Sequence, residues 1–150
     1  MGKVVLASGV FDLLHYGHLR FLEEAKNSGG KGAKLVVVVA RDKTVMRMKG
    51  KPPIMPEEER RALVEALKVV DEAILGFEDF DMERVLNTVR PDIVALGYDQ
   101  GYLEDKVKRA AKNIGINVRI VKIKKFGKRL SSSEIKKQIA KRFLKSVERS

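Results

Sequence analysis

The sequence contains no cysteine and no tryptophan, and only four of its 150 residues are proline. The absence of cysteine excludes disulfide bonds, thiolate metal sites and a cysteine nucleophile. No apolar run approaches the ~18 residues that a membrane-spanning helix needs. The first residues lead directly into VVLA, which is too short for a secretory signal. We therefore expect a cytoplasmic protein with no membrane partner.

Composition indicates a folded chain with an uneven charge distribution. It is 44% hydrophobic and 34% charged, and its length fits one domain over residues 1–150. The net charge of +11 is concentrated in residues 119–150, which hold twelve basic and two acidic residues. A basic end attracts polyanions, either phosphorylated small molecules or nucleic acid, but it is equally typical of a solvated helix face.

Apolar runs alternate with helical patterns along the chain. Expected strands cover 3–8, 34–40, 72–75, 92–96 and 118–123. Expected helices cover about 17–27, 57–69, 81–89 and 104–114, and a last helix starts at the serines of 131–133. The run LVVVV does not alternate with polar residues, which is typical of a strand buried on both faces of a parallel sheet. The pattern predicts a single-domain, three-layer α/β/α Rossmann-like sandwich with a five-stranded parallel sheet and a C-terminal helix.

The loop after the first strand carries the strongest functional signal. Ligands of such folds bind beyond the carboxyl ends of the strands, where the strand order reverses. Both histidines of the chain, His15 and His18, fall here, with Gly17 between them at a helix start. Free N–H groups and imidazoles at a helix start favour a phosphate. The alternative is that His15 only caps a turn and His18 lies on the surface; zinc is disfavoured because no further His or Cys exists.

The stretch GVFDLLHYGH resembles the (T/S)-G-x-F-D-x-x-H-x-G-H motif of the cytidylyltransferase-like nucleotidyltransferases. The resemblance implies that His15 and His18 contact the triphosphate and the transition state. It also implies nucleotide contacts, largely through backbone, at Gly9, Val10, Phe11, Tyr16 and Gly17. For Asp12 we expect a carboxylate that fixes the loop, in preference to a metal ligand.

Residues 40–71 resemble the second block of the same family. The resemblance implies that Lys49, in the KGK triplet, reaches a phosphate and that Arg60 is associated with the triphosphate. A guanidinium fork suits phosphate geometrically. Lys51 is expected on the acceptor side, although both lysines are also compatible with a solvated loop. The candidate catalytic residues are therefore His15, His18, Lys49 and Arg60.

Two further blocks complete the resemblance. Gly97-Tyr98-Asp99 resembles the family's G-x-D, which implies that Gly97 lets the backbone approach the base and that Asp99 accepts from ribose or base. A simple strand-end turn is the alternative. RLSSSEI resembles the family's I-S-T-T block, so Ser131 and Ser132 are expected at phosphate, whereas ordinary helix capping needs only one of them.

The sequence departs from the family before the serine block. Phe126 stands where an arginine is frequent, so Phe126, Lys128 and Arg129 are expected on the acceptor side, and Lys125 is a further basic residue that could replace the arginine. An aromatic ring here could stack on a ring of the acceptor.

Within the family, RDKTV…KGKPPIMPEEERRALVEALKVVDEAILG most resembles the archaeal FAD synthases. The resemblance implies transfer of AMP from ATP to FMN, with pyrophosphate released, Mg²⁺ arriving with ATP, no metal site of the protein's own and no tightly bound organic cofactor. Glycerol-3-phosphate cytidylyltransferase is the alternative enzyme. A non-catalytic nucleotide- or nucleic-acid-binding module is the less favoured alternative. Family members are often dimers, so a homodimer is an open expectation.

Overall fold

The fold is built on a sheet of five parallel strands. The computed structural model describes residues 2–79, 81–126 and 131–149. The strands are β1 (Val4–Gly9), β2 (Lys34–Val39), β3 (Glu72–Leu75), β4 (Ile93–Leu96) and β5 (Arg119–Lys122), in the order β3-β2-β1-β4-β5. All four pairings are parallel, and each expected strand is confirmed to within a residue or two at its ends.

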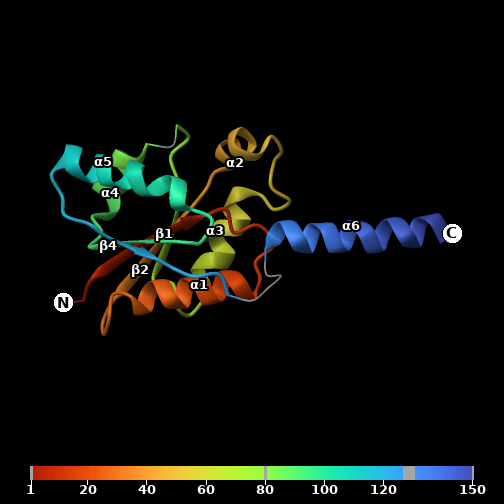
Figure 1. The fold of residues 1–150 in the computed structure, drawn as a ribbon, viewed down its shortest axis with the longest axis horizontal. Coiled ribbons are helices and arrows are strands. Elements are labelled where there is room, and N and C mark those ends of the chain that lie inside the picture. The colour runs from red at the N-terminus through yellow and green to blue at the C-terminus, as the bar shows by residue number, and fades with distance from the viewer. Residues whose placement is uncertain (1, 80, 127–130, 150) are drawn as a thin grey trace.

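Helices cover both faces of this sheet (Figure 1). They are α1 (Tyr16–Asn27), α2 (Asp42–Lys49), α3 (Glu57–Glu65), α4 (Met82–Val89), α5 (Glu104–Ile114) and α6 (Ser132–Arg149), with a short 3₁₀ turn η1 (Gly101–Leu103) before α5. Leu22 of α1 and Val64 of α3 pack in the core on one face. Leu86 of α4 and Val107 of α5 pack in the core on the other. The three-layer α/β/α sandwich predicted from the sequence is therefore confirmed.

Two helices differ from their expected extent. The short helix α2 has no counterpart among the expected elements, because only Thr44 and Val45 of its eight residues are buried and its apolar pattern is weak. The helix expected over 57–69 ends at Glu65. The chain then forms a turn in which the Val70 N–H donates to the Leu67 C=O, and this turn places Val70 in the core.

The strand order reverses between β1 and β4. The chain moves outward from β1 through β2 to β3, then returns to the other side of β1 to form β4. Gln100 joins the two neighbouring strand ends: its Nε2 donates to Ser8 C=O at 2.8 Å, and its Oε1 accepts from Gly97 N–H at 2.9 Å. This edge of the sheet is where ligands bind in open α/β folds.

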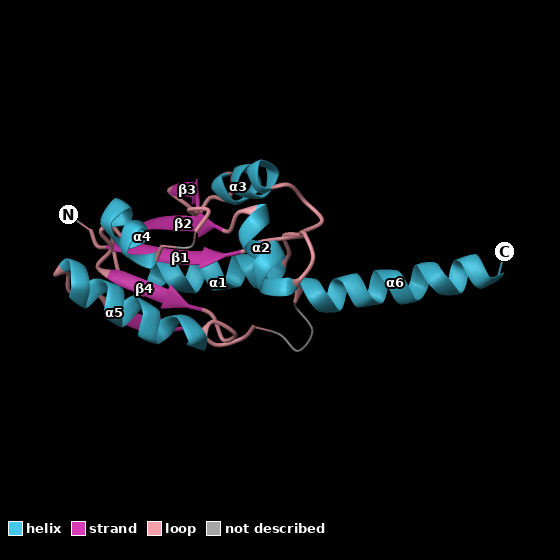
Figure 2. Cartoon of the chain, turned by 90° about the horizontal axis from the view of Figure 1, so that it is seen from above, coloured by secondary structure: helices cyan, strands magenta, loops and turns pink. Residues whose placement is uncertain are grey.

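Helix α6 projects away from the sandwich. Both views show it extending outward from the side that carries the start of α1 (Figures 1 and 2). Its first turn touches the body, and its exposed side chains include Ile139, Phe143 and Leu144. In the described ranges no helix is long and apolar enough to cross a membrane.

Candidate active site

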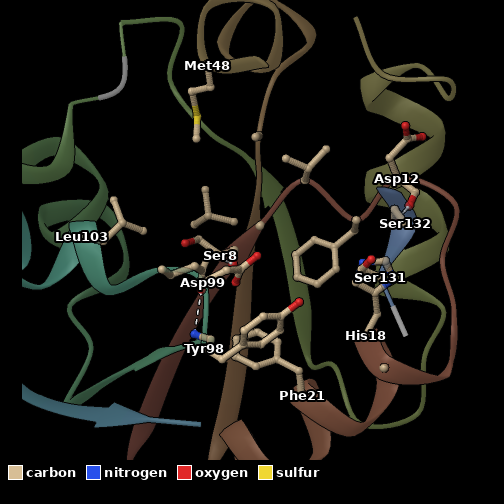
Figure 3. Close-up of a pocket in the computed structure, with 18 of the residues that line it drawn as sticks. Ser8, Asp12, His18, Phe21, Met48, Tyr98, Asp99, Leu103, Ser131 and Ser132 are labelled. Carbon is tan, nitrogen blue, oxygen red and sulfur yellow. Dashed lines mark hydrogen bonds between the residues drawn. The ribbon is translucent and has the colours of Figure 1, made fainter. Parts of the chain in front are cut away.

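A cavity opens at the strand-order reversal. Its walls are the carboxyl ends of β1 and β4, the start of α1, part of α2, the segment after β5 and the start of α6 (Figure 3). Most residues that the sequence assigned to the site lie in its wall: Gly9, Val10, Phe11, His15, Gly17, His18, Lys49, Gly97, Asp99, Phe126, Ser131 and Ser132. The topology therefore brings together residues from four blocks that are separate in the sequence.

The two histidines form the first turn of α1. His15 is the N-cap, and its Nδ1 accepts the Gly17 N–H at 3.0 Å. His18 reaches back, and its Nδ1 accepts the His15 N–H at 3.1 Å. The rings stack with centroids 3.9 Å apart. This reciprocal arrangement is a capping box built from imidazoles, and it fixes both rings relative to the helix start.

The hydrogen bonds also fix where the protons lie. A neutral imidazole that accepts at Nδ1 carries its proton on Nε2. Burial, the neighbouring His15 and Lys49 lower the pKa of His18 to about 4, against the opposing effect of Asp12. Burial also lowers the pKa of His15. Both rings are therefore neutral near pH 7 and act as Nε2–H donors. His15 Nε2 is buried and has no hydrogen-bond partner in the described part of the chain.

Asp12 holds the loop between β1 and α1. Its carboxylate accepts from the N–H of Ile54 at 2.8 Å and of Met55 at 3.0 Å, and it pairs with Lys136 Nζ at 2.8 Å. Burial would raise the pKa of Asp12, but Lys136 and the two amides outweigh it and lower that pKa. These bonds give each of the two carboxylate oxygens at least one protein donor. The expected loop-fixing role is confirmed.

The loop around Asp12 has a constrained backbone. Phe11 and Leu13, on either side of Asp12, have φ of 54° and 53°, a region that non-glycine residues seldom occupy. Such conformations persist where the surroundings impose them, and they cluster at functional sites. Here the buried Phe11 ring leans against His18, with centroids 5.4 Å apart. A Cβ on Gly9 would lie 2.9 Å from that ring, so Gly9 leaves room for it.

The start of α6 closes the polar end of the cavity. Ser131 Oγ accepts the Glu134 N–H at 3.1 Å, which is ordinary helix capping. Ser132 Oγ donates to the backbone C=O of Asp12. Figure 3 shows both serines beside His18 and Asp12. The positive ends of two helices, α1 and α6, thus meet at one place, and this favours a bound anion.

Positive side chains also line the cavity. Lys49, the last residue of α2, lies in the wall and is close enough to His18 to affect its pKa. Lys125, which could replace the arginine of the family, also lines the cavity, as do Arg41 and Lys124, which were not singled out in the sequence. Arg41 stands two residues after the end of the buried strand β2, and this position at a strand end could have identified it as a site residue from the sequence. With Asp12 already paired, Asp99 is the carboxylate in the described wall that can accept from a ligand.

Arg60 does not line the cavity, contrary to the expected contact with the triphosphate. Its side chain is 0% exposed. The guanidinium donates to the C=O groups of Met55, Val10 and Ala40 at 2.7–2.8 Å. It also pairs with Asp42 at 2.6 Å. These bonds join the loop after β1, the end of β2 and the segment before α3. Arg60 therefore holds these three segments of the site together without lining the cavity.

Other expected contacts fall elsewhere. Tyr16 is 60% exposed and lies outside the cavity wall, because the N-cap geometry turns its side chain away. Lys51 is exposed on the loop after α2 and does not line the cavity either. Lys128 and Arg129 lie outside the described residues. Gln100 was missed, since no spacing in the sequence marks it.

Much of the rest of the cavity wall is aromatic. Its wall includes Phe21, Phe77, Tyr98, Tyr102 and Phe126. The Arg20 guanidinium lies 5.0 Å from the Phe126 ring centroid, and Lys125 Nζ lies 5.2 Å from that of Tyr98. Flat apolar surfaces beside a cationic end suit ligands that carry both rings and phosphates.

The described residues contain no group of three or more His, Asp or Glu side chains that could hold a metal ion. The carboxylate of Asp12 in the cavity wall already accepts from two amides and pairs with Lys136. These residues do not fit a metal held by the protein alone.

Comparison with known proteins gives consistent matches. The sequence profile described as Cytidylyltransferase-like matches residues 6–138. The FAD synthase of Methanopyrus kandleri is 52% identical over 137 residues, which are 91% of this chain and 89% of that protein. The FAD synthase of Thermoplasma acidophilum is 51% identical over 136 residues, 90% and 92% of the two chains. A crystal structure from Thermoplasma volcanium GSS1, described as a lipopolysaccharide core biosynthesis protein, has a TM-score of 0.76 and 47% identity, covering 85% of this chain and all of that one.

Proposed function

Because the chain belongs to the cytidylyltransferase-like family, we propose that it is an FAD synthase, a nucleotidyltransferase that moves AMP from ATP onto FMN and releases pyrophosphate. Residues 1–150 act as one nucleotidyltransferase domain in this proposal. The observation that carries it is the cavity at the strand reversal, which joins two neutral imidazole donors, two helix N-termini and a wall of aromatic side chains. The FAD synthases at about 50% identity over most of the chain support the same acceptor.

The polar end is the proposed triphosphate site. Nε2–H of His15 and of His18 donate to phosphoryl oxygens, and Lys49 adds positive charge beside them. The unpartnered donor on His15 supports this assignment, since buried polar groups without a partner are rare in native structures. The positive ends of α1 and α6 add to this end of the cavity. The Ser131 hydroxyl accepts the Glu134 N–H and keeps its own proton to donate, whereas the Ser132 hydroxyl already donates to the Asp12 C=O.

The aromatic part of the wall is the proposed binding region for the two ring systems. Gly97 keeps the end of β4 open, and the exposed carboxylate of Asp99 accepts from ribose hydroxyls of the nucleotide. Phe126 offers a ring face to the isoalloxazine, with Lys125 near the FMN phosphate. An aromatic wall of this kind favours FMN over an acceptor without rings, such as glycerol 3-phosphate.

The chemistry is a direct transfer. A phosphate oxygen of FMN attacks the α-phosphorus of ATP, the bond to the oxygen bridging the α- and β-phosphorus breaks, and pyrophosphate leaves with that electron pair. A phosphate monoester has a second pKa near 6, so FMN attacks as the dianion at pH 7 and no general base is needed. This agrees with histidines that are neutral donors. Catalysis then rests on positioning and on preorganised donors to the developing charge.

Mg²⁺ enters the proposal as part of the MgATP substrate. The described residues offer no metal cluster, so its ligands come mainly from the triphosphate. The residues of the chain position the phosphates through Lys49, the imidazoles and the helix N-termini.

The test measures pyrophosphate release by the purified protein with Mg²⁺. ATP and CTP are each assayed with four acceptors: FMN, glycerol 3-phosphate, phosphopantetheine and a sugar phosphate. We expect turnover with ATP and FMN, and FAD identified by its mass and absorbance. CDP-glycerol formation would instead assign a cytidylyltransferase. Triphosphate binding without turnover for any pair would identify a binding module.

A further inference from the structure

Arg41 lies in the part of the cavity wall that is formed by the ends of β2 and β3. It is the N-cap residue of α2, and Gly76 and Phe77, which follow β3, line the cavity together with it. The Arg41 side chain is 32% exposed. The reaction proposed above gives this arginine no role.

Two hydrogen bonds hold the Arg41 guanidinium in place. Its Nε donates to the Gly76 C=O at 2.6 Å, and its Nη1 donates to Glu57 Oε2 at 3.1 Å. The other oxygen of that carboxylate, Oε1, accepts the Asp42 N–H at 2.9 Å, which fixes Glu57 itself. Glu57 is not among the described residues of the wall, so it holds Arg41 without facing a ligand. A side chain that is already held loses little conformational freedom when it binds.

The guanidinium of Arg41 still has donors for a ligand. It carries five N–H groups, and the two bonds above use two of them. Arg60 provides the contrast within the same chain, since its side chain is 0% exposed and donates to three carbonyl groups and Asp42. Arg60 is enclosed by the protein, whereas Arg41 is held by the protein and remains open to the cavity.

A phosphate group is the ligand that suits this guanidinium. A guanidinium only donates, and its planar fork matches the spacing of phosphate oxygens. The carboxylates in the described wall are those of Asp12, which pairs with Lys136, and Asp99, which lies beyond the end of β4. Neither of them is bonded to Arg41, so an anionic ligand would not have to displace a carboxylate of the wall.

We propose that Arg41 binds a phosphate group of a substrate, and that Glu57 is the residue that positions it. The inference rests on the proposed function, in which both substrates carry phosphate. The same chemistry has two sources: the phosphate of FMN, and the β- and γ-phosphates of ATP that leave as pyrophosphate. In either case the remaining N–H groups of Arg41 donate to phosphate oxygens, and its charge adds to that of Lys49.

The experiment removes the guanidinium from the protein and the phosphate from the ligand, separately and together. Affinities of the wild type and of Arg41→Met are measured for FMN and riboflavin by flavin fluorescence, and for ATP with Mg²⁺ and adenosine by calorimetry. Riboflavin and adenosine are the same ligands without phosphate. Arg41→Met should bind a phosphorylated ligand about 10- to 100-fold more weakly, as for the loss of one charge-assisted hydrogen bond. The affinity for the phosphate-free form of that ligand should change less than twofold.

The two ligand pairs identify the source of the phosphate. A loss confined to FMN assigns Arg41 to the acceptor phosphate, and a loss confined to ATP assigns it to the triphosphate. Losses for both, with riboflavin and adenosine unchanged, place it between the two substrates. Arg41→Lys keeps the charge without the planar fork, so it should lose a smaller factor for the same ligand. This variant also supplies the measurement if circular dichroism shows that Arg41→Met does not fold.

Arg47→Met is the matched control on the same helix. Arg47 is exposed and lies outside the described wall, but it also donates to a backbone carbonyl of the segment after β3, that of Glu78. The substitution therefore removes the same charge from α2 and a similar bond to the same segment. All four affinities should stay within twofold of the wild type.

Two outcomes would overturn the inference. Equal losses for a phosphorylated ligand and its phosphate-free form would show that Arg41 only shapes the wall. Unchanged affinities for all four ligands would show that it contacts none of them. The proposed function fails separately, if the wild type forms no FAD from ATP and FMN, and the comparison of ATP with adenosine then still decides whether Arg41 binds phosphate.

Discussion

His15 and His18 stack against each other, and the Nδ1 of each ring accepts a hydrogen bond from a backbone N–H at the start of α1. Structural and chemical roles are thus divided between the two nitrogens of each ring. Nδ1 builds the helix cap, whereas Nε2 is the donor available to a ligand. This division makes the two roles separable by substitution.

Replacing His15 with asparagine should remove the donor and keep the cap. Asparagine is a good N-cap residue, and its Oδ1 can accept the Gly17 N–H in place of Nδ1. We expect kcat to fall about 10²–10³-fold, as for the loss of one preorganised donor. His18→Ala should lose kcat by a similar factor. Steady-state FAD synthesis measures both, with thermal unfolding as the check on folding. Turnover near the wild-type rate in His15→Asn would remove His15 Nε2 from the mechanism.

Stability should depend on pH through His18. Its pKa is about 4 in the folded chain and about 6.5 when unfolded, so between these values the unfolded state binds a proton that the folded state does not. Stability is therefore present above pH 6.5 and is lost as the pH falls towards 4. Between pH 7 and pH 5 we expect a loss of about 2 kcal/mol from this group.

The measurement is urea unfolding of the wild type and of His18→Asn at pH 7 and pH 5. The variant lacks the imidazole and should lose correspondingly less stability over that interval. Equal losses in the two proteins would show that His18 titrates normally.

Arg60→Met should destabilise the fold strongly. The substitution keeps the side chain long and apolar but leaves three buried carbonyl groups without their donor. We expect a loss of about 3–5 kcal/mol, which corresponds to a fall in Tm of at least about 6 °C. Arg61→Met, next along α3 and more exposed, is the control and should leave the Tm nearly unchanged. Calorimetry compares the two; a stable Arg60→Met variant that binds ATP poorly would instead indicate a direct role with the triphosphate.

The Asp12–Lys136 pair should couple the loop to α6. Asp12 is buried and Lys136 is partly exposed, with 2.8 Å between Oδ2 and Nζ. A double-mutant cycle with Asp12→Asn and Lys136→Met should give a coupling free energy of about 1–3 kcal/mol. Urea unfolding of the four proteins supplies the cycle. Additive effects would mean that the ion pair does not hold the two segments together.

Phe126→Ala should weaken flavin binding selectively. The loss of a stacked ring is worth about 0.5–1.5 kcal/mol, so the KM for FMN should rise about 2- to 12-fold. The KM for ATP should stay within twofold of the wild type. Phe77→Ala, also in the aromatic wall, is the comparison. An equal rise in both KM values would place Phe126 outside the acceptor site.

The fold was predictable where local pattern and burial agree. The unalternating LVVVV run indicated a parallel strand, and β2 occupies it with five buried residues. The helix α2 was missed because eight residues with two buried side chains leave almost no periodic signal. The end of α3 was misplaced because tertiary packing of Val70, not local propensity, sets it.

The site was predictable where the backbone determines it. The loop after β1 and the serines before α6 converge because the carboxyl ends of parallel strands share one edge. Arg60 shows the limit of this reasoning. A motif can mark an arginine as important near phosphates, but only packing shows that its guanidinium is buried and bonded to three carbonyl groups and Asp42.

The Gln100 side chain, which joins Ser8 and Gly97, restricts how this scaffold could change its substrate. It ties the two halves of the sheet together at the floor of the cavity, so the floor cannot widen without breaking two hydrogen bonds. To accommodate a larger or smaller acceptor, the cavity must change shape at α2 and at the segment after β5. Divergence in specificity would therefore accumulate in those two segments, while the strand ends and their glutamine stay unchanged.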